Sequence, residues 1–224
     1  MPTIGTEPLT EHCGHIYRQR HHALFGMSPG NSYFSRSRIR QTLQWAFDEF
    51  ESVHAYLPEQ GTYFTFRAIG YSEDDSRRKT RKEVRALRNR IRHALEDLGI
   101  EEPDRHIVGL DTLQKSVQYA HLRTRTHEAY RSDQQFREAC LGNARDFLTG
   151  RELRGSIPDR TRQTMAARYI LTKLPTYIDT PSLVGVPSSV RCYHRPTDFD
   201  RAFFDRSFSL RPSGNQGFVR VSAQ

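Results

Sequence analysis

The sequence contains no long hydrophobic run, and apolar residues make up 36% of its 224 positions. No segment approaches the roughly 18 uninterrupted apolar residues that a membrane-spanning helix needs. The first residues, MPTIGTEPLTEHCGH, have neither the basic region nor the apolar core of a secretory signal. We therefore expect a cytoplasmic protein that does not enter a membrane.

Cysteine is also scarce in this chain. The three cysteines, Cys13, Cys140 and Cys192, lie far apart in the sequence, and no C-x-x-C pair occurs. An odd and widely spaced set argues against a disulfide framework and lacks the spacing of a zinc knuckle. We expect reduced thiols, no bound metal and no cofactor.

Acidic residues are outnumbered by basic ones. The 26 Asp and Glu face 34 Lys and Arg, which gives a net charge of +8. This balance favours polyanionic partners such as nucleic acid. Aromatic residues make up 11% of the chain, a content that argues against disorder.

Strands and helices are predicted to alternate along the chain. The predicted strands are short and apolar, whereas the helical segments place apolar residues three and four positions apart. Strands are predicted at 22–25, 54–58, 105–110 and 185–194, and helices at 36–53, 73–98, 113–149 and 159–174. The alternation predicts an α/β fold, a single Rossmann-like domain over residues 21–224 with a mainly parallel sheet flanked by helices.

Three further segments carry weaker signals. Residues 1–20 are expected to form a flexible N-terminus. Residues 61–72, GTYFTFRAIGYS, fit either a strand or a loop. Residues 211–224 are expected to give an edge strand.

The predicted helix 73–98 carries one sign of charge on one face. Beside its apolar stripe lies a row of basic residues, Arg78, Arg81, Lys82, Arg85, Arg88 and Arg92. Like charges at helical neighbours repel each other, and a phosphate backbone would relieve that repulsion and release counterions. The alternative is an ordinary solvated surface. The one-sided charge favours contact with nucleic acid, either RNA or DNA.

Ser28 lies in the stretch FGMSPGNSYFS, in which GMSPG fits the G-x-S-x-G pattern of a nucleophilic serine. Most serines in such loops are turn residues. The position near the N-terminus and the lack of an H-G-G-G segment disfavour a lipase or esterase, although a small serine hydrolase stays an alternative.

A second block, VPSSVRCYH, ends a predicted strand with Tyr193 and His194. Both side chains can move protons or polarise a carbonyl. Tyr169 lies on the preceding predicted helix. Because ligands bind at the carboxyl edge of a parallel sheet, we expect these side chains to meet Ser28 there.

These residues resemble the tRNA-dependent cyclodipeptide synthase family. HALFGMSPGNSYFS is similar to the serine-loop motif of that family, and VPSSVRCYH is similar to its second signature block. The order of the segments between these two blocks fits as well. A basic helix comes first, the segment RTRTHEAYRSDQQFREAC follows it, and a Tyr-bearing helix ending in LP and DTP comes last. The resemblance extends from His22 to His194. It is closest to the subgroup with Asn in the serine loop and Tyr-His in the second block.

The resemblance implies the fold of the catalytic domain of class I tyrosyl- and tryptophanyl-tRNA synthetases, without ATP binding. It also implies that two aminoacyl-tRNAs are joined by a ping-pong route and released as a cyclic dipeptide, a 2,5-diketopiperazine. The basic helix would dock the first tRNA. No ATP, metal or membrane partner is expected, and the oligomeric state stays open with a monomer favoured.

The resemblance also implies roles for single residues. Ser28 would attack the first aminoacyl ester and hold the acyl group covalently. Tyr193 would relay protons, with His194 supporting it, and Tyr169 would hydrogen-bond the substrate amino group. Gly26 would leave room for the acyl group, and Asn31 would brace the loop.

One position departs from the family pattern. Four residues after Tyr169 the family has a glutamate, whereas this chain has Lys173, which would repel a substrate ammonium group. Three explanations are open: another base such as His194 or a nearby histidine, a catalytically silent tRNA- or RNA-binding relative, or a lysine that faces an acidic substrate.

The substrate pocket carries a related hint. Leu24, Lys173, Thr176 and Arg191 are the expected substrate-binding residues, and the family has apolar residues at the Thr176 and Arg191 positions when it selects large hydrophobic substrates. The hypothesis is that one pocket accepts a carboxylate, so that the product contains Glu or Asp. The alternative is an Arg191 that points away from the pocket at the surface.

Overall fold

The computed structural model describes residues 4–223. One six-stranded sheet has the order β1-β6-β5-β2-β3-β4, and every neighbouring pair except β1–β6 is parallel. The strands are β1 (Ile4–Pro8), β2 (His22–Gly26), β3 (Ser52–Leu57), β4 (Ile107–Gly109), β5 (Ser189–Tyr193) and β6 (Gln216–Ala223). The mainly parallel α/β fold is therefore confirmed.

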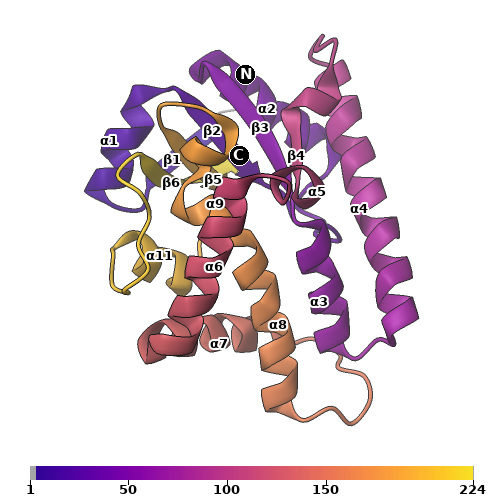
Figure 1. Cartoon of the computed structure of the whole chain (residues 1–224). Helices are drawn as coiled ribbons and strands as arrows, with labels where there is room; N and C mark the ends of the chain where they lie inside the picture. The colour runs from indigo at the N-terminus through magenta and orange to yellow at the C-terminus, as the bar shows by residue number, and fades with distance from the viewer. Residues whose placement is uncertain (1–3, 224) are drawn as a thin grey trace.

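Helices cover both faces of this sheet (Figure 1). The longest is α4, and its first turn is stabilised by the Ser72 side chain, which accepts from the backbone N–H of Asp75. None of the described helices is long and apolar enough to cross a bilayer. They are α1 (Glu11–Gln19), α2 (Arg36–Glu49), α3 (Glu59–Ile69), α4 (Glu73–Glu96), the 3-10 turn η1 (Pro103–His106), α5 (Leu110–Leu113), α6 (Val117–Ser132), α7 (Gln134–Leu148), α8 (Asp159–Lys173), α9 (Pro175–Ile178), α10 (Thr180–Val184) and α11 (Asp198–Phe204).

Side chains alternate between the two faces of the sheet, as the period of two in a strand requires. Phe25 of β2 packs in the apolar core that includes Leu87 of α4. The preceding residue, Leu24, packs instead with Tyr119 of α6. The long basic helix α4 and helix α6 therefore cover opposite faces.

The segment 61–72 is neither a strand nor a loop, because most of it belongs to helix α3. Its aromatic residues resemble a strand pattern, but α3 packs along α8. Gly61 lies so close to α8 that a Cβ atom there would come within 2.5 Å of the Tyr169 ring. Gly70 ends the helix with φ of +109°, a left-handed conformation that suits glycine.

The expectations for both ends of the chain were wrong. Within residues 1–20, β1 pairs with β6, and α1 buries Cys13 and Ile16. Residues 1–3 lie outside the described residues. Strand β6 is not an edge strand, because it lies between β5 and β1, and β1 itself forms that edge.

Candidate active site at the carboxyl end of strands β2 and β5

Ser28 follows β2, and a tight turn holds its backbone in place. The Met27 N–H donates to the Tyr56 carbonyl at 3.1 Å, which ties the start of the loop to β3. The Asn31 N–H donates to the Ser28 carbonyl at 3.3 Å, and the Asn31 side chain accepts from the Tyr33 N–H at 2.9 Å. Asn31 thus lies where it can brace the serine loop.

Two tyrosine hydroxyl groups reach the Ser28 hydroxyl. Tyr193 ends β5, the parallel neighbour of β2, and its hydroxyl oxygen lies 3.1 Å from Ser28 Oγ. Tyr169 of α8 lies beside the same hydroxyl, and its side chain interacts with Ser28 and Tyr193. Burial raises the pKa of both tyrosines, so both hydroxyls are protonated near neutral pH. The structure thus brings Ser28 and Tyr193 together at the carboxyl edge of the sheet, with Tyr169 beside them.

Gly26 leaves space at the floor of this site. A Cβ atom at Gly26 would lie 2.6 Å from Nη2 of Arg191 and 3.5 Å from the Tyr193 ring. Any larger residue would displace the guanidinium group.

His194 lies against an aromatic wall rather than on Ser28. Its ring stacks on Tyr33 with centroids 3.7 Å apart, and its centroid is 4.5 Å from that of Tyr193. Burial, with Arg195 and Arg38 nearby, lowers the pKa of His194 to about 4. Since a group with that pKa accepts a proton poorly near pH 7, His194 is better suited to packing against Tyr193 than to general base catalysis.

Lys173 lies inside the site, one helical turn after Tyr169. Its Nζ donates to the Tyr177 hydroxyl at 3.0 Å and lies 5.3 Å from the centroid of the Tyr169 ring. The fully buried Tyr177 also lies near Arg191 and Asp200. No sequence motif marked Tyr177 or Asp200 as neighbours of the site.

Arg191 points into the molecule, and only 3% of it is exposed. Its Nη1 donates to Thr176 Oγ1 at 2.9 Å, and its Cζ lies 4.3 Å from the centroid of the Tyr177 ring. Leu24 is its partner in the register of β2 and β5. The alternative of a surface arginine is therefore excluded.

The surroundings of Arg191 hold unpaired polar atoms. Among the described residues, Arg191 Nε and the buried Tyr56 hydroxyl have no hydrogen-bond partner. Arg191 forms no ion pair with a carboxylate within residues 4–223. A buried cation without a carboxylate is costly, so this pocket suits an anionic ligand group.

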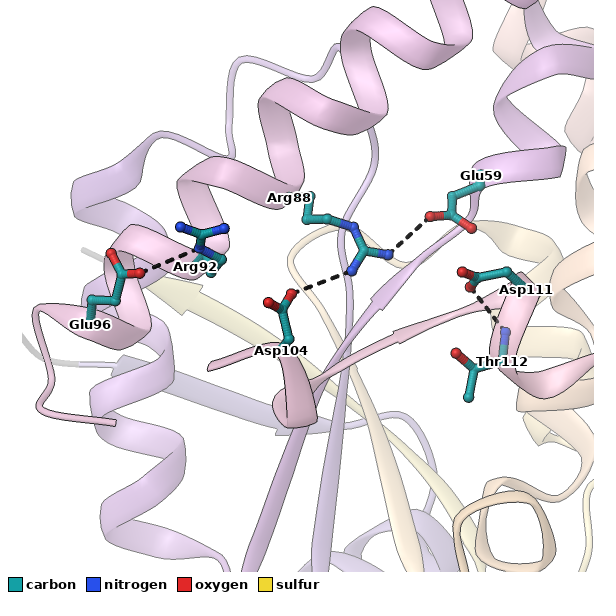
Figure 2. Close-up of polar contacts among 7 residues, drawn as sticks. All are labelled: Glu59, Arg88, Arg92, Glu96, Asp104, Asp111 and Thr112. Atoms are coloured by element: carbon teal, nitrogen blue, oxygen red, sulfur yellow. Dashed lines mark hydrogen bonds and ion pairs between the residues drawn. The ribbon is translucent and has the colours of Figure 1, made fainter. Parts of the chain in front are cut away.

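Three of the six predicted tRNA-binding residues on α4 have carboxylate partners. Figure 2 shows Arg88 between Glu59 and Asp104, at 3.2 and 3.6 Å, and Arg92 beside Glu96 at 3.3 Å. Arg78 pairs with Asp75 at 2.7 Å. The half-buried Arg88 is thereby held against the protein, whereas the three exposed cations without an ion pair to a described residue are Arg81, Lys82 and Arg85.

The three cysteines are free and buried, as expected for reduced thiols. Within the described part of the chain, no group of three or more His, Cys, Asp or Glu side chains is arranged to hold a metal ion.

Known proteins share this architecture. A family model described as cyclodipeptide synthase matches residues 4–223. The cyclo(L-leucyl-L-phenylalanyl) synthase of Streptomyces noursei is 31% identical over 210 residues, covering 93% of this chain and 88% of that protein. The cyclo(L-tyrosyl-L-tyrosyl) synthase of Mycobacterium tuberculosis is 30% identical over 215 residues, covering 96% of this chain and 74% of that protein.

A solved structure links this fold to tRNA synthetases. A Mycobacterium tuberculosis protein, described as demonstrating that cyclodipeptide synthetases are related to type I tRNA synthetases, superposes with a TM-score of 0.86 at 28% identity. The match covers 99% of this chain and 94% of that one. The fold, the arrangement around Ser28 and these matches lead to one conclusion: the chain belongs to the cyclodipeptide synthase family of aminoacyl-tRNA-dependent transferases.

Proposed function

We propose that the protein joins two aminoacyl groups by a ping-pong mechanism through an ester on Ser28. In the first step Ser28 Oγ bonds to the carbonyl carbon of an aminoacyl-tRNA, and the bond to the tRNA ribose oxygen breaks. The Ser28 proton passes through the Tyr193 hydroxyl to the departing ribose oxygen. The hydrogen-bond distance between Ser28 and Tyr193, 3.1 Å, is the observation that carries this proposal.

In the second step the amino group of another aminoacyl-tRNA attacks the Ser28 ester. A peptide bond forms, Ser28 regains its proton, and the amino group of the first residue then closes the ring on the second ester. The second tRNA leaves with the ring closure. Both esters are already activated, so the reaction needs no ATP.

The other site residues have supporting parts in this proposal. Tyr169 hydrogen-bonds the amino group of the first residue, Gly26 leaves room for its acyl group, and Asn31 holds the loop. His194 fixes Tyr193 by packing against it. On α4 the exposed Arg81, Lys82 and Arg85 bind the phosphates of the first tRNA. The reaction takes place in the cytoplasm, where charged tRNA is available, and a monomer is sufficient for it.

The first acyl group is proposed to be Glu or Asp. Arg191 is buried without a carboxylate partner, and Lys173 places a second cation close to the same tyrosine. A substrate carboxylate next to Arg191 would accept from its free Nε and from the Tyr56 hydroxyl. Bidentate pairing of this kind is a strong means of selecting a carboxylate.

Mass spectrometry tests the proposal in bacteria that express the protein, with Ser28→Ala as the control. A diketopiperazine containing Glu or Asp in the medium, absent from the control, is expected. Intact-mass measurement of the purified protein after mixing with aminoacyl-tRNA should show one added acyl group, again only with Ser28 present. A product made only of apolar residues would refute the acidic pocket but not the ester mechanism.

The second candidate function is tRNA binding without catalysis, and Lys173 is the observation that favours it. A lysine in place of the family glutamate cannot accept a proton from a substrate ammonium group. Tight tRNA binding without an acyl-enzyme or a product would support this candidate.

A further inference from the structure

Helix α6 carries a second basic surface that the proposed chemistry of Ser28 does not use. Its exposed residues include Arg123, His127 and Arg131, which are spaced four positions apart and therefore follow one face of the helix. We refer to these three residues as the α6 stripe. Partial loss of solvent around the His127 ring lowers its pKa, and the charges of Arg123 and Arg131 lower it further, as expected if all three are neighbours.

The α6 stripe is not neutralised by the protein. Neither Arg123 nor Arg131 forms an ion pair with any residue between 4 and 223. Glu128 is the one carboxylate of α6, and it makes no ion pair with them either. The row of like charge destabilises the helix slightly unless an anion binds it.

The first turn of α6, which lies in line with the α6 stripe, forms part of the site. Tyr119 is buried, packs with Leu24 and Tyr56, and donates from its hydroxyl to the Thr172 carbonyl at 3.1 Å. Arg123 follows Tyr119 by four residues, or one helical turn. An anion on the α6 stripe would therefore lie close to the wall of the acyl pocket.

The α6 stripe and the basic face of α4 lie on different sides of the molecule. The buried side of α4 packs on one face of the sheet, and the buried side of α6 packs on the other. Figure 1 shows α3 and α8 between these two helices. Both helices come near the serine loop and its strand: a Cβ atom at Gly30 would lie 3.8 Å from Glu83 of α4, and Tyr119 of α6 packs with Leu24 of β2.

The ping-pong chemistry requires two directions of approach. When the second aminoacyl-tRNA reacts, the first acyl group already occupies its pocket on Ser28. The second ester must therefore enter from another side, and its acceptor stem is displaced from the position that the first tRNA used. A phosphate backbone needs cations along that second route.

We propose that the α6 stripe is the docking surface for the phosphate backbone of the second aminoacyl-tRNA, distinct from the first-tRNA surface on α4. This inference rests on the proposed ping-pong function. The partner is recognised by charge and by the spacing of its phosphates, so the stripe contributes affinity without selecting the amino acid.

Separate measurement of the two half-reactions tests the inference. The α6 variant is Arg123→Gln with Arg131→Gln. The α4 variant is Arg81→Gln with Lys82→Gln. As a control, Arg18→Gln with Arg201→Gln removes two exposed cations from α1 and α11, neither of which forms an ion pair with a described residue.

The first half-reaction is acylation of Ser28 by labelled aminoacyl-tRNA, and the second is consumption of isolated acyl-enzyme by a second aminoacyl-tRNA below saturation. In the α6 variant we expect the rate of Ser28 acylation to stay within about twofold of wild type. The rate of the second half-reaction should fall about tenfold. The α4 variant should show the reverse pattern, and the control should change neither rate. An α6 variant that slows both half-reactions equally, or neither, overturns the inference.

A binding measurement separates failure of this inference from failure of the proposed function. Bulk deacylated tRNA is titrated against the α4 variant, with and without the two α6 substitutions. Their addition should weaken the remaining binding about tenfold and reduce the slope of log K against log salt by about 2. If wild type forms no acyl-enzyme, the proposed function fails. In that case the tRNA titration alone decides whether the α6 stripe binds tRNA. Unchanged binding after the two α6 substitutions overturns the inference.

Discussion

The ammonium group of Lys173 donates a hydrogen bond to the hydroxyl oxygen of Tyr177 at 3.0 Å. The Arg191 guanidinium lies over the Tyr177 ring, with Cζ 4.3 Å from the ring centroid, and Asp200 lies nearby. The lysine is thus part of a buried polar network rather than a side chain that merely fills the place of a glutamate. Its charge acts on the two tyrosines that surround Ser28, since it opposes the burial that raises their pKa values.

Lys173→Glu tests what this charge does for substrate choice. The new carboxylate would lose the hydrogen bond to Tyr177 and would repel an acidic acyl group. We expect the yield of the Glu- or Asp-containing product to fall at least tenfold, because one close charge pair contributes a few kcal/mol at an effective dielectric constant of about 20. Product masses in the culture medium measure this. Lys173→Met, which removes the charge without reversing it, should give an intermediate loss, and a higher yield of acidic product in Lys173→Glu would contradict the assignment.

Arg191→Leu tests the acidic pocket directly. The substitution replaces a buried cation that has no carboxylate partner with an apolar side chain. The free energy of unfolding is expected to rise by about 1 kcal/mol or more, while acylation by Glu or Asp is lost. Chemical denaturation and intact-mass spectrometry measure the two effects. Thr176→Val removes only the acceptor of Nη1, so it should keep acidic acylation at a reduced rate. Unchanged acidic acylation in Arg191→Leu would rule out the pocket.

Gly26→Ala should impair acylation without unfolding the protein. The added Cβ would lie 2.6 Å from Arg191 Nη2, so the guanidinium must move away from the acyl group. A displacement of about 1 Å near reacting groups can reduce a rate roughly a hundredfold. Rapid-quench measurement of acyl-enzyme formation tests this. Gly142→Ala is the matched control, since a Cβ atom there would meet nothing within 4 Å beyond its chain neighbours and the backbone of α7. Normal acylation in Gly26→Ala would contradict the expectation.

Tyr193→Phe removes the hydroxyl that lies next to Ser28 Oγ. If Tyr193 carries the proton during transfer, the rate of the first half-reaction should fall about 10²- to 10⁴-fold with little change in tRNA affinity. Single-turnover kinetics and a tRNA titration separate the two quantities. A loss confined to tRNA affinity would show that Tyr193 positions the substrate instead.

A buried histidine pair at the other end of the sheet makes the fold sensitive to acid. His22 is 1% exposed, and its Nε2 lies 2.9 Å from His54 Nδ1, while its Nδ1 lies 2.7 Å from Ser189 Oγ. Burial, with His54 nearby, lowers the pKa of His22 from 6.5 to about 3. Between these values the unfolded chain takes up a proton that the folded chain does not.

The stability that His22 contributes is therefore complete above about pH 6.5 and is lost as the pH falls toward 3. At pH 5 the loss amounts to about 2 kcal/mol. Denaturant titrations between pH 4 and pH 8, in steps of about one unit, measure this dependence. His22→Asn should flatten it and the exposed His15→Asn should not, whereas equal acid sensitivity of all three proteins would assign the effect to other groups.

The sequence was sufficient to predict the central strands, their mainly parallel arrangement and the approach of Tyr193 to Ser28. These follow from local patterns and from the rule that parallel strands end at one edge. Helix α3 was not predictable in the same way, because its aromatic residues match strand propensity and only the contact with α8 decides the outcome. The pairing of β1 with β6 joins the two ends of the chain, so no local pattern could indicate it.

The inner part of the site was also beyond sequence reasoning. Period-two alternation places Arg191 on the same face of β5 as Tyr193, yet it does not reveal whether that face is buried at Arg191. Tyr177 and Asp200 belong to no motif, and they reach the site only through the packing of α9 and α11. At Arg88 the sequence pattern was misleading. The row of basic residues on α4 indicated a cation free to bind phosphate, whereas Glu59 and Asp104 lie beside it.

The contact between Gly61 and Tyr169 has a mechanical consequence. Helix α3 touches the ring of Tyr169 with its glycine backbone and leads through a short turn into α4, which carries the exposed cations Arg81, Lys82 and Arg85. A side chain at position 61 would push directly on the Tyr169 ring and on Thr172. Glycine at this position therefore lets α3 and α8 pack closely while the Tyr169 ring keeps its place in the site.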